Sequence, residues 1–553
     1  MYTNRSIDRN DGRNGHEQRA NEVMGSAMAR WIDRLIVVSL FLFAAFASHS
    51  IAATQTAWAL GMLLWLARFT CYPRPRLSRT TVDYALFGFF LLSGISAFAS
   101  YEPLVSIGKL RAASLFTIVY LFAENIPSRR VLRLLVLTLV VSCMVNVLYT
   151  IGERIVGRGV KVQGVSAASP LASAALNARQ KSHSVPITDG DTLLQVDGRP
   201  LRDTIDLIST LGSLEHTSAL IKIYRTEWVA TLAVPRGRLL PGDTPEAQLG
   251  ISSWSRGRDW RASGFYGHYI TYAEALQLIM ALAVGLFVSS PSKRSWPAAL
   301  IGLTIAGMIV ALLLTVTRAS WVGFLLATAL IVFLGSGRRM LFIIGGLAVP
   351  LVLAGLFLLG EKRKVSFFDR RDDSTVWRET VWRQGFQLLV SKPRHLLVGV
   401  GMDSIKGHWR EWGLFDNGRM PLGHMHSNLL QLGLERGLPA LMVWLTLLVL
   451  YGRTLWGLLR RAPGNHAPAA SAHDRKQGKH RGGAIENGDN EGRWVEQGLV
   501  LGALGGLAGF FVSGLVHYNW GDSEVVMIFY FIMGLSLGLA KLINQTKPQS
   551  KTT

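Results

Sequence analysis

Long apolar segments recur along this chain of 553 residues, and they limit its fold more than any other feature. A helix needs about 20 mostly apolar residues to cross the hydrocarbon core of a bilayer. The sequence therefore predicts an all-α polytopic membrane protein with about 12 transmembrane helices. The predicted spans are residues 31–48, 51–69, 82–99, 109–123, 131–152, 265–288, 297–316, 319–335, 339–359, 437–458, 495–516 and 524–543.

The composition agrees with this prediction. Hydrophobic residues make up 49% of the chain and charged residues 17%, a balance typical of a membrane protein. The formal net charge is +22, but its lysines and arginines gather in short connections between apolar segments, as the positive-inside rule requires. We therefore expect no nucleic-acid partner. Two cysteines, Cys71 and Cys143, are too few for a disulfide framework.

The positions of the basic residues predict the orientation of the helices. With the first thirty residues inside, each short cytoplasmic connection carries several Lys or Arg, and two long segments fall outside. Residues 1–30 contain no short apolar core followed by a cleavage site, so we expect a cytoplasmic tail. The predicted segments are the tail at 1–30, helices one to five at 31–152, an outer insert at 153–264, helices six to nine at 265–359, an outer loop with an amphipathic helix at 360–425, helix ten at 426–459, a disordered cytoplasmic loop at 460–494, helices eleven and twelve at 495–543, and a tail at 544–553.

The outer insert has the pattern of a small α+β domain. Strand-like runs at 192–196, 220–224 and 229–234 are separated by Asp-Gly turns. Over residues 159–236 the order of these segments resembles bacterial PDZ domains, with an insertion near 176–186. PDZ domains accept a peptide as an added strand, so the resemblance implies a peptide or protein partner. A spacer domain that rests on the membrane core is the alternative.

A histidine-bearing polar segment stands directly before the tenth apolar span. It contains His424 and His426 and leads into Gly437. Imidazole titrates near neutral pH, so a histidine at a membrane boundary can exchange a proton with a lipid-borne substrate. A hydrogen-bonded structural histidine is the alternative. No cluster of Cys, Asp or Glu completes a ligand set, so no metal is predicted, and no nucleotide-binding loop is present, so we expect no cofactor.

Three arginines are candidates for binding an anion. Arg318 separates two apolar spans at the outer face, where an ionisable group is costly without a partner. An arginine that snorkels to the interface beside Trp321 is the alternative. Arg378 and Arg383 lie on a predicted amphipathic helix, and the alternative for them, solvation or contact with lipid headgroups, fits Arg383 better than Arg378. Converging guanidinium groups would suit a diphosphate leaving group.

Four segments together resemble the O-antigen ligase and O-antigen polymerase superfamily. The ligase pattern is His, then Asn, Ser or Gln, nine residues, and Gly-x-x-Gly, and it fits His426, Ser427 and Gly437, although Ala440 replaces the final glycine. The resemblance covers about 264–543, is weaker over the first five spans and is absent over the insert. The segments are Arg-Ala-Ser-Gly-Phe-Tyr-Gly-His at 261–268, Thr-Arg-Ala-Ser-Trp at 317–321, Arg378 and Trp382 followed by Lys-Pro at 392–393 and Gly-Val-Gly at 399–401, and the histidine segment.

The resemblance implies an activity and roles for residues. Such ligases move a glycan from undecaprenyl diphosphate to a sugar hydroxyl of lipid A-core at the periplasmic face of the bacterial inner membrane, with inversion and without metal or nucleotide. The diphosphate-binding arginines carry over to Arg318 and Arg378, and the essential histidine carries over to His426. We hypothesise that the arginines hold the diphosphate while His426 orients or deprotonates the acceptor hydroxyl. The further substrate-binding candidates are Arg261, His268, Arg383 and His424.

Other functions stay open at this point. A polymerase that extends lipid-linked repeats, or an oligosaccharyltransferase that glycosylates a protein hydroxyl, would use the same chemistry, and the insert slightly favours a protein acceptor. A transporter would need ionisable groups at mid-bilayer depth, where the sequence offers only Glu274 near an outer end. A signalling receptor is the least favoured function, because no cytoplasmic segment resembles an output domain.

Overall fold

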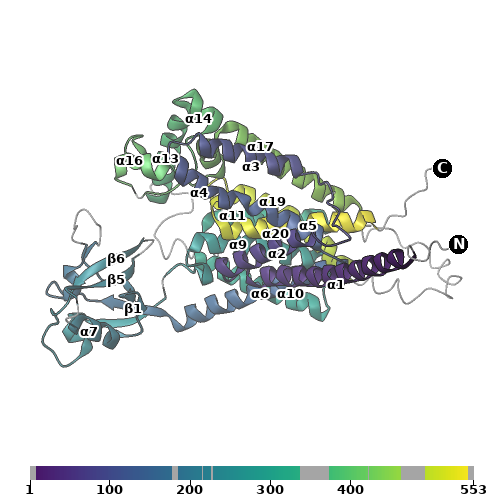
Figure 1. Cartoon of the computed structure of the whole chain (residues 1–553). Helices are drawn as coiled ribbons and strands as arrows, with labels where there is room; N and C mark the ends of the chain where they lie inside the picture. Colours follow the sequence, from purple (N-terminus) through teal and green to yellow (C-terminus); the bar gives the residue numbers. More distant parts are fainter. Residues whose placement is uncertain are drawn as a thin grey trace, which may run out of the picture. The chain divides into compact units, whose positions relative to one another are not determined.

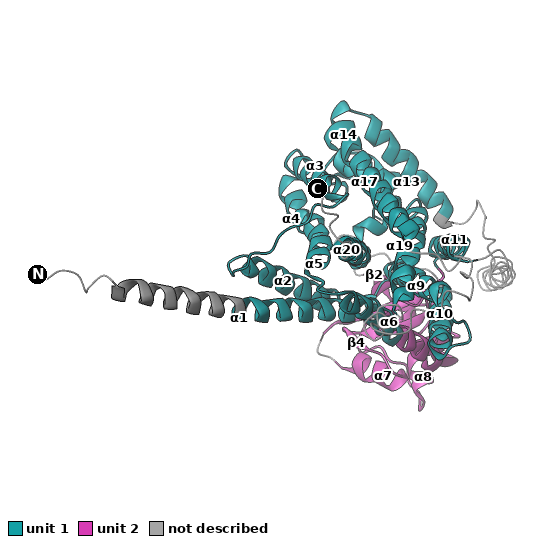
Figure 2. Ribbon diagram, turned by 90° about the vertical axis from the view of Figure 1, so that its right-hand side faces the viewer, with its two compact units in different colours: residues 1–146, 265–313, 317–553 teal, residues 147–264, 314–316 magenta. Residues whose placement is uncertain are grey.

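Long helices and one small sheet make up the computed structural model of this protein (Figure 1). It describes residues 8–176, 185–213, 216–225, 228–258, 260–336, 373–420, 422–461 and 492–545. The predicted span at 339–359 and nearly all of the predicted loop at 460–494 lie outside these ranges. The described chain divides into two compact units (Figure 2): unit 1 contains residues 1–146, 265–313 and 317–553, and unit 2 contains 147–264 and 314–316.

Helices begin and end close to the predicted apolar segments, because those segments bury apolar side chains against one another. α1 begins at Asp8, inside the predicted tail. The long helices are α1 (Asp8–Phe46), α2 (Ile51–Arg68), α3 (Asp83–Phe98), α4 (Pro103–Ala113), α5 (Thr117–Asn125), α6 (Arg129–Val156), α9 (Tyr269–Ser289), α10 (Trp296–Thr315), α11 (Arg318–Gly335), α13 (Asp373–Val390), α17 (Asn428–Arg461), α19 (Arg493–Ser513) and α20 (Ser523–Gln545). Shorter helices are α14 (Pro393–Val398), α15 (Ile405–His408), α16 (Leu414–Gly418) and the 3-10 turns η1 (Ser114–Phe116) and η5 (Asn519–Gly521).

Eight helical segments in the described ranges are long and apolar enough to cross a membrane. The prediction of a mostly helical, multi-pass membrane protein with a small sheet is therefore confirmed, and the count of about 12 spans stays a prediction. α1 and α2 are helical where the first two spans were predicted but are not among the eight. The eight are Pro103–Asn125, Arg129–Val156, Tyr269–Ser289, Trp296–Thr315, Arg318–Gly335, Asn428–Arg461, Arg493–Ser513 and Ser523–Gln545.

The core of unit 1 is built around α9, whose residues are buried almost throughout. α19 packs against it through glycines. A Cβ added at Gly285 would overlap the backbone of Gly498 and Gly502, so the two helices approach more closely than larger side chains would allow. This packing fixes the turn after α19, which contributes to the cavity described below.

α17 is broken near its start. It runs for 34 residues, and Gly437 inside it has φ 82°, outside the helical region. At 1.5 Å per residue a continuous helix of this length would measure about 51 Å, well beyond the roughly 30 Å hydrocarbon core. Pro439 adds to the break because it lacks a backbone N–H. The nine residues from Asn428 to Arg436 therefore form a short helix ahead of the membrane-spanning part.

A second segment satisfies the carbonyl groups left open at this break. Val400 N donates to Leu434 O at 2.8 Å, and Gly401 N donates to Glu435 O at 3.0 Å. Ser96 Oγ also donates to Glu435 O at 2.7 Å. The Gly-Val-Gly segment thus replaces the hydrogen bonds that a regular helix would have made. It fixes the position of the end of the short helix.

Unit 2 contains an antiparallel sheet of seven strands in the order β2-β6-β5-β3-β1-β7, with β4 paired to β3. Three predicted strand runs fall within β3, β5 and β6, and α7 lies between β4 and β5. Apolar side chains from both sheet and helices form its core. The elements are β1 (Arg158–Gln163), β2 (Ala175–Leu176), β3 (Thr192–Val196), β4 (Arg199–Pro200), α7 (Thr204–Gly212), β5 (Ser218–Arg225), β6 (Trp228–Pro235), α8 (Pro245–Leu249) and β7 (Ser253–Gly257).

Candidate active site

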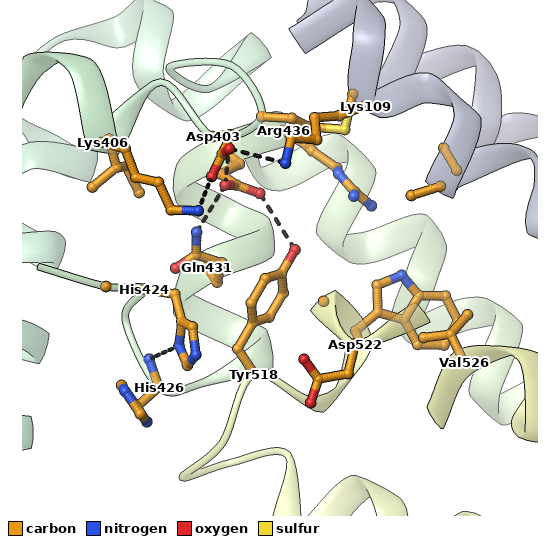
Figure 3. A pocket seen from close by; sticks show the side chains of 18 of the residues that line it. Lys109, Asp403, Lys406, His424, His426, Gln431, Arg436, Tyr518, Asp522 and Val526 are labelled. Carbon is orange, nitrogen blue, oxygen red and sulfur yellow. Dashed lines mark hydrogen bonds and ion pairs between the residues drawn. The ribbon is translucent and has the colours of Figure 1, made fainter. Parts of the chain in front are cut away.

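A cavity of about 580 Å³ lies in unit 1, beside the histidine segment (Figure 3). Its walls come from parts of the chain that are far apart in sequence: α3, α4, the start of α9, the segment at 402–406, the histidine segment with the start of α17, and the segment from η5 into α20. Its lining is rich in ionisable groups and aromatic rings. The ionisable or aromatic lining residues are Phe89, Lys109, His268, Tyr269, Asp403, Lys406, His424, His426, Glu435, Arg436, Tyr518, Trp520, Asp522 and Tyr530.

The two predicted histidines lie side by side in this wall. Their ring centroids are 4.1 Å apart, and the backbone N–H of His426 donates to Nδ1 of His424 at 3.1 Å. His426 has φ 45°, a left-handed conformation that costs energy for a non-glycine residue. The Trp377 ring meets the His426 ring edge-on at 4.5 Å. The backbone and α13 together therefore hold the His426 ring in place.

The backbone of Met425, which lies between the two histidines, is fixed by two polar side chains. Trp382 Nε1 donates to the carbonyl of Met425 at 2.8 Å. Gln431 Oε1 accepts from the Met425 backbone N–H at 2.6 Å. One side chain from α13 and one from α17 thus hold the carbonyl and the N–H of Met425. The histidine segment is consequently anchored on both sides.

Both histidines are neutral at physiological pH in this structure. Burial, then the charges of His517, His268 and Lys406, lower the pKa of His424 to about 4. Burial is also the largest cause for His426, followed by the charges of His424, His517, Arg378 and His268, and lowers its pKa to about 2. A neutral imidazole can accept a hydrogen bond or a proton from a hydroxyl group. His426 is therefore in the protonation state that a proton acceptor requires.

A carboxylate with two lysines forms the opposite wall. Lys109 Nζ lies 3.0 Å from Asp403 Oδ2, and Lys406 Nζ lies 2.8 Å from Asp403 Oδ1. Burial alone would raise the pKa of Asp403, but the hydrogen bonds from the lysines outweigh it and lower the pKa. Asp403 thus stays charged and keeps the two ammonium groups together at the cavity.

A buried carboxylate lies behind this wall. Glu435 is 4% exposed and accepts hydrogen bonds from the Asp403 backbone N–H at 2.9 Å and from Gln431 Nε2 at 2.8 Å. The Tyr518 hydroxyl donates to its other oxygen at 3.4 Å. Figure 3 shows the hydroxyl of Tyr518 pointing toward the side of the cavity that carries Asp403. Glu435 therefore joins the lysine wall, the histidine segment and the turn before η5.

A third carboxylate of the cavity, Asp522, has a pKa close to neutral pH. Asp522 Oδ2 accepts a hydrogen bond from Thr271 Oγ1 at 2.9 Å, and Thr271 Oγ1 lies 3.4 Å from Nδ1 of His268. Burial is the largest cause of a pKa raised to about 7, with the charges of Glu524 and Glu274 adding to it and the Thr271 hydrogen bond opposing it. A group with this pKa can take up or release a proton under physiological conditions.

The predicted site residues do not all reach the cavity. His268, His424 and His426 line it, whereas the described lining does not include any of the predicted arginines. Arg378 lies on α13 near enough to His426 for its charge to lower the pKa of that histidine. The remaining three are Arg383, which is exposed on α13, Arg318 at the first position of α11, and Arg261, which belongs to unit 2.

The start of α11, where Arg318 is the first residue, is held to the turn after α19 by buried side chains. Two residues further along α11, Ser320 Oγ donates to Glu274 Oε1 at 3.1 Å. Glu274 in turn contacts His517 Nδ1 at 2.9 Å, and the charge of His517 lowers the pKa of both cavity histidines. The corner that carries Arg318 is therefore fixed to the turn after α19.

Several lining residues were not predicted from the sequence. For Glu435 and Arg436 a signal was present, because adjacent charges at the start of an apolar span are costly without a partner. Lys109 and Lys406 carry no comparable signal. Each is one basic residue among 58, and only the folded chain shows that both contact Asp403.

No metal-binding group of three or more His, Cys, Asp or Glu side chains is found within the described ranges. The cavity instead presents neutral imidazoles, cations, carboxylates and aromatic rings near the ends of apolar helices. This combination suits a polar, anionic substrate whose lipid part lies in the membrane.

Comparison with known protein families agrees with this geometry. Residues 303–445 match the family model described as O-antigen ligase. This region of the chain is similar to the O-antigen ligase superfamily. The matched region contains Arg318, Arg378, the lysine wall residues Asp403 and Lys406, and the whole histidine segment. No curated protein matches the chain. The O-antigen ligase domain and the apolar helices together indicate a multi-pass membrane enzyme of ligase or polymerase type that acts in O-antigen processing.

Proposed function

We propose that this protein moves a glycan from undecaprenyl diphosphate to a hydroxyl group of lipid A-core at the periplasmic face of the bacterial inner membrane. The observation that carries the proposal is the cavity beside the histidine segment of the O-antigen ligase domain, where His426 lies among cationic and aromatic side chains. Aromatic rings such as Trp520 offer flat apolar surfaces for sugar rings, and the cations offer donors to phosphate oxygens.

In the proposed step, an acceptor hydroxyl donates a hydrogen bond to His426 and attacks the anomeric carbon of the donor glycan. A new carbon–oxygen bond forms as the bond from that carbon to the diphosphate oxygen breaks, which inverts the configuration. The hydroxyl proton passes to His426, and the electron pair leaves with the diphosphate. Burial keeps His426 neutral before substrate binds, and the negative charge of the diphosphate would stabilise the imidazolium that forms.

Arg318 and Arg378 are the proposed diphosphate-binding residues. The proximity of Arg378 to His426 and the buried connection from Ser320 through Glu274 to His517 support a common site. His268, His424, Arg261 and Arg383 are proposed to contact the rest of the substrates. The proposed step needs no nucleotide, because the lipid diphosphate already activates the glycan, and no metal, because Arg318 and Arg378 are proposed to stabilise the departing diphosphate.

The transfer can be tested with purified protein, a lipid-diphosphate-linked glycan and lipid A-core. We expect His426→Ala and Arg318→Ala to lower the transfer rate at least about a hundredfold, the usual contribution of one acid–base or electrostatic group. His408→Ala and Arg419→Ala are matched controls, because both residues lie outside the described lining of the cavity. Normal transfer by the His426 and Arg318 variants would refute the assignment.

The acceptor can be identified in the host. Deletion of the gene, followed by electrophoresis of lipopolysaccharide, should remove the long-chain ladder while lipid-linked polymer accumulates. A band with a single repeat would instead indicate a polymerase. An unchanged ladder with a missing glycoprotein would indicate a protein O-oligosaccharyltransferase.

We propose further that unit 2 is a PDZ-like domain. The order of β3, β4, α7, β5 and β6, with antiparallel pairing, supports this. β7 pairs with β1 along residues Ser253–Gly257, so a peptide that joined the sheet as an added strand would pair with the edge strands β2 or β7. The spacer role stays an alternative, and it predicts that the full-length protein binds no peptide through β2 or β7.

A further inference from the structure

Arg436 is the last residue before the break in α17. It is 7% exposed and lines the cavity. Its guanidinium carbon lies 5.0 Å from the centroid of the Phe89 ring. Figure 3 shows Arg436 on the same side of the cavity as Lys109 and Asp403. The break at Gly437 and the hydrogen bonds to the Gly-Val-Gly segment fix its backbone.

The guanidinium group of Arg436 has unused donors. Its Nε and Nη1 atoms are buried and have no hydrogen-bond acceptor in the described part of the chain. A cation–π contact leaves those in-plane N–H groups unsatisfied, because it uses only the face of the guanidinium. A buried charge without hydrogen-bond partners is unfavourable. An acceptor supplied by a ligand would remove this cost.

The neighbouring Glu435 does not fill this need. Its carboxylate accepts from the Asp403 backbone N–H, Gln431 Nε2 and the Tyr518 hydroxyl, all of which are neutral donors. The charge of Arg436 acts on the adjacent Glu435 carboxylate, but Nε and Nη1 of Arg436 still have no acceptor within the described residues. Glu435 therefore balances the charge of Arg436 without filling these donors.

Two further cations share the wall. Lys109 and Lys406 each contact Asp403 through one hydrogen bond, and an ammonium group has three donors, so both keep donors for a ligand. Asp403 and Glu435 balance part of this charge, and Asp522 is only partly ionised near neutral pH. A tetrahedral oxyanion has enough acceptor oxygens for a forked guanidinium and two ammonium groups.

We propose that Arg436, together with Lys109 and Lys406, forms a phosphate-binding position in this cavity. It deepens the proposed function, in which the bound phosphate would belong either to the lipid diphosphate donor or to a phosphorylated sugar of the acceptor. The position is distinct from the proposed Arg318 and Arg378 contacts, since neither of those arginines belongs to the described lining.

Equilibrium binding to the full-length purified protein in lipid nanodiscs tests this without turnover. The probes are farnesyl diphosphate and glucose 6-phosphate, with farnesol and glucose as neutral counterparts. Arg436→Gln removes the charge-assisted hydrogen bonds that Arg436 would make to a phosphate. It should therefore raise the Kd for one of the two phosphate probes about ten- to a hundredfold. The probe that is affected identifies the source of the phosphate. Arg436→Lys should fall between wild type and Arg436→Gln, because the charge stays and the fork is lost.

Arg460→Gln is the matched control. Arg460 belongs to the same helix and its guanidinium also lies 5.0 Å from an aromatic centroid, that of Trp456, but it is exposed and outside the cavity. Lys406→Gln, at a side chain 59% exposed, gives a variant expected to fold even if Arg436→Gln does not, and it should raise the same Kd severalfold. Unchanged Kd values in both cavity variants, or wild-type protein that binds neither phosphate probe, would overturn the proposal. Because no transfer is measured, this outcome is independent of the His426 assignment.

Discussion

His517 Nδ1 lies 2.9 Å from Glu274 Oε1, and both side chains are buried. Ser513 Oγ and Asn519 Nδ2 donate to the other carboxylate oxygen, at 2.7 Å and 3.1 Å. Ser320 from α11 donates to the first. Glu274, near an outer end of its span, is the acidic residue that a transporter could have used. Its satisfied hydrogen bonds instead give it a structural role, in which α9 holds the Arg318 corner and the η5 turn together.

Replacing this carboxylate should destabilise the protein. Glu274→Gln keeps the size of the side chain but replaces one acceptor oxygen with an NH₂ group. This group would face side chains that donate hydrogen bonds to the carboxylate in the wild type, such as Ser513 and Asn519. We expect a loss of about 2–4 kcal/mol in the free energy of unfolding, measured by chemical denaturation in detergent. Glu411→Gln is the control, because Glu411 also contacts a histidine, His408 Nδ1 at 2.7 Å, but is 61% exposed. A loss of equal size in the control would contradict this explanation.

The cavity histidines should make the protein less stable in acid. The pKa of His426 falls from 6.5 to about 2 and that of His424 to about 4, mainly through burial. Below pH 6.5 the unfolded state takes up protons that the folded state does not, so stability is highest above pH 6.5 and falls as the pH drops. His426→Asn should flatten this slope by up to about 1.4 kcal/mol per pH unit.

The measurement is the denaturation midpoint of wild type and variant between pH 7 and pH 4. His408→Asn, which changes a histidine outside the cavity, serves as the control. If His426→Asn follows the wild-type slope throughout, His426 is not held neutral by its surroundings.

Asp522 should act with the opposite sign. Its pKa rises from 3.8 to about 7 because of burial. Between these values the folded state keeps a proton that the unfolded state has lost, so this carboxyl reduces stability as the pH rises from about 4 to 7. Asp522→Asn removes the effect while its amide oxygen can still accept from Thr271 Oγ1.

The variant should therefore gain stability relative to wild type as the pH rises, by up to about 1.4 kcal/mol per pH unit within that window. Asp416→Asn at an exposed carboxylate is the comparison. A difference between wild type and Asp522→Asn that does not change with pH would show that Asp522 is ordinarily charged in the fold.

The parts of the fold that depend on apolar patterning were predictable from the sequence. The predicted span at 265–288 corresponds to α9 at Tyr269–Ser289, and the predicted strand at 192–196 is β3. Burial of apolar side chains determines where this helix and this strand form, and the spacing of the apolar residues is visible in a single sequence. Of the candidate site, the histidine segment was predictable because its polar residues stand directly before an apolar span.

The rest of the cavity was not predictable, because tertiary contacts between distant segments create it. Lys109 and Asp403 are separated by 294 positions, counted as 403 minus 109. Their contact depends on how α4 packs beside the segment after Gly401. No local periodicity reports such packing, and a lysine on an exposed surface has the same sequence signature.

The break in α17 gives a last prediction, on the glycine that the ligase pattern contains. Gly437 has φ 82°, and a Cβ added there would overlap the Leu397 carbonyl. Gly437→Ala should therefore destabilise the protein by at least about 1–2 kcal/mol and displace Arg436 and Glu435 from the cavity wall, which would lower glycan transfer as well. Gly457→Ala in the same helix has open space and helical backbone, so we expect it to be neutral or to stabilise by up to about 1 kcal/mol. Denaturation midpoints and transfer rates of the two variants, measured side by side, test this.

Because Ala440 is helical and fully buried, the pattern tolerates alanine there, whereas the positive φ at 437 requires glycine. Equal behaviour of the two glycine variants would show that the break is not needed for the site.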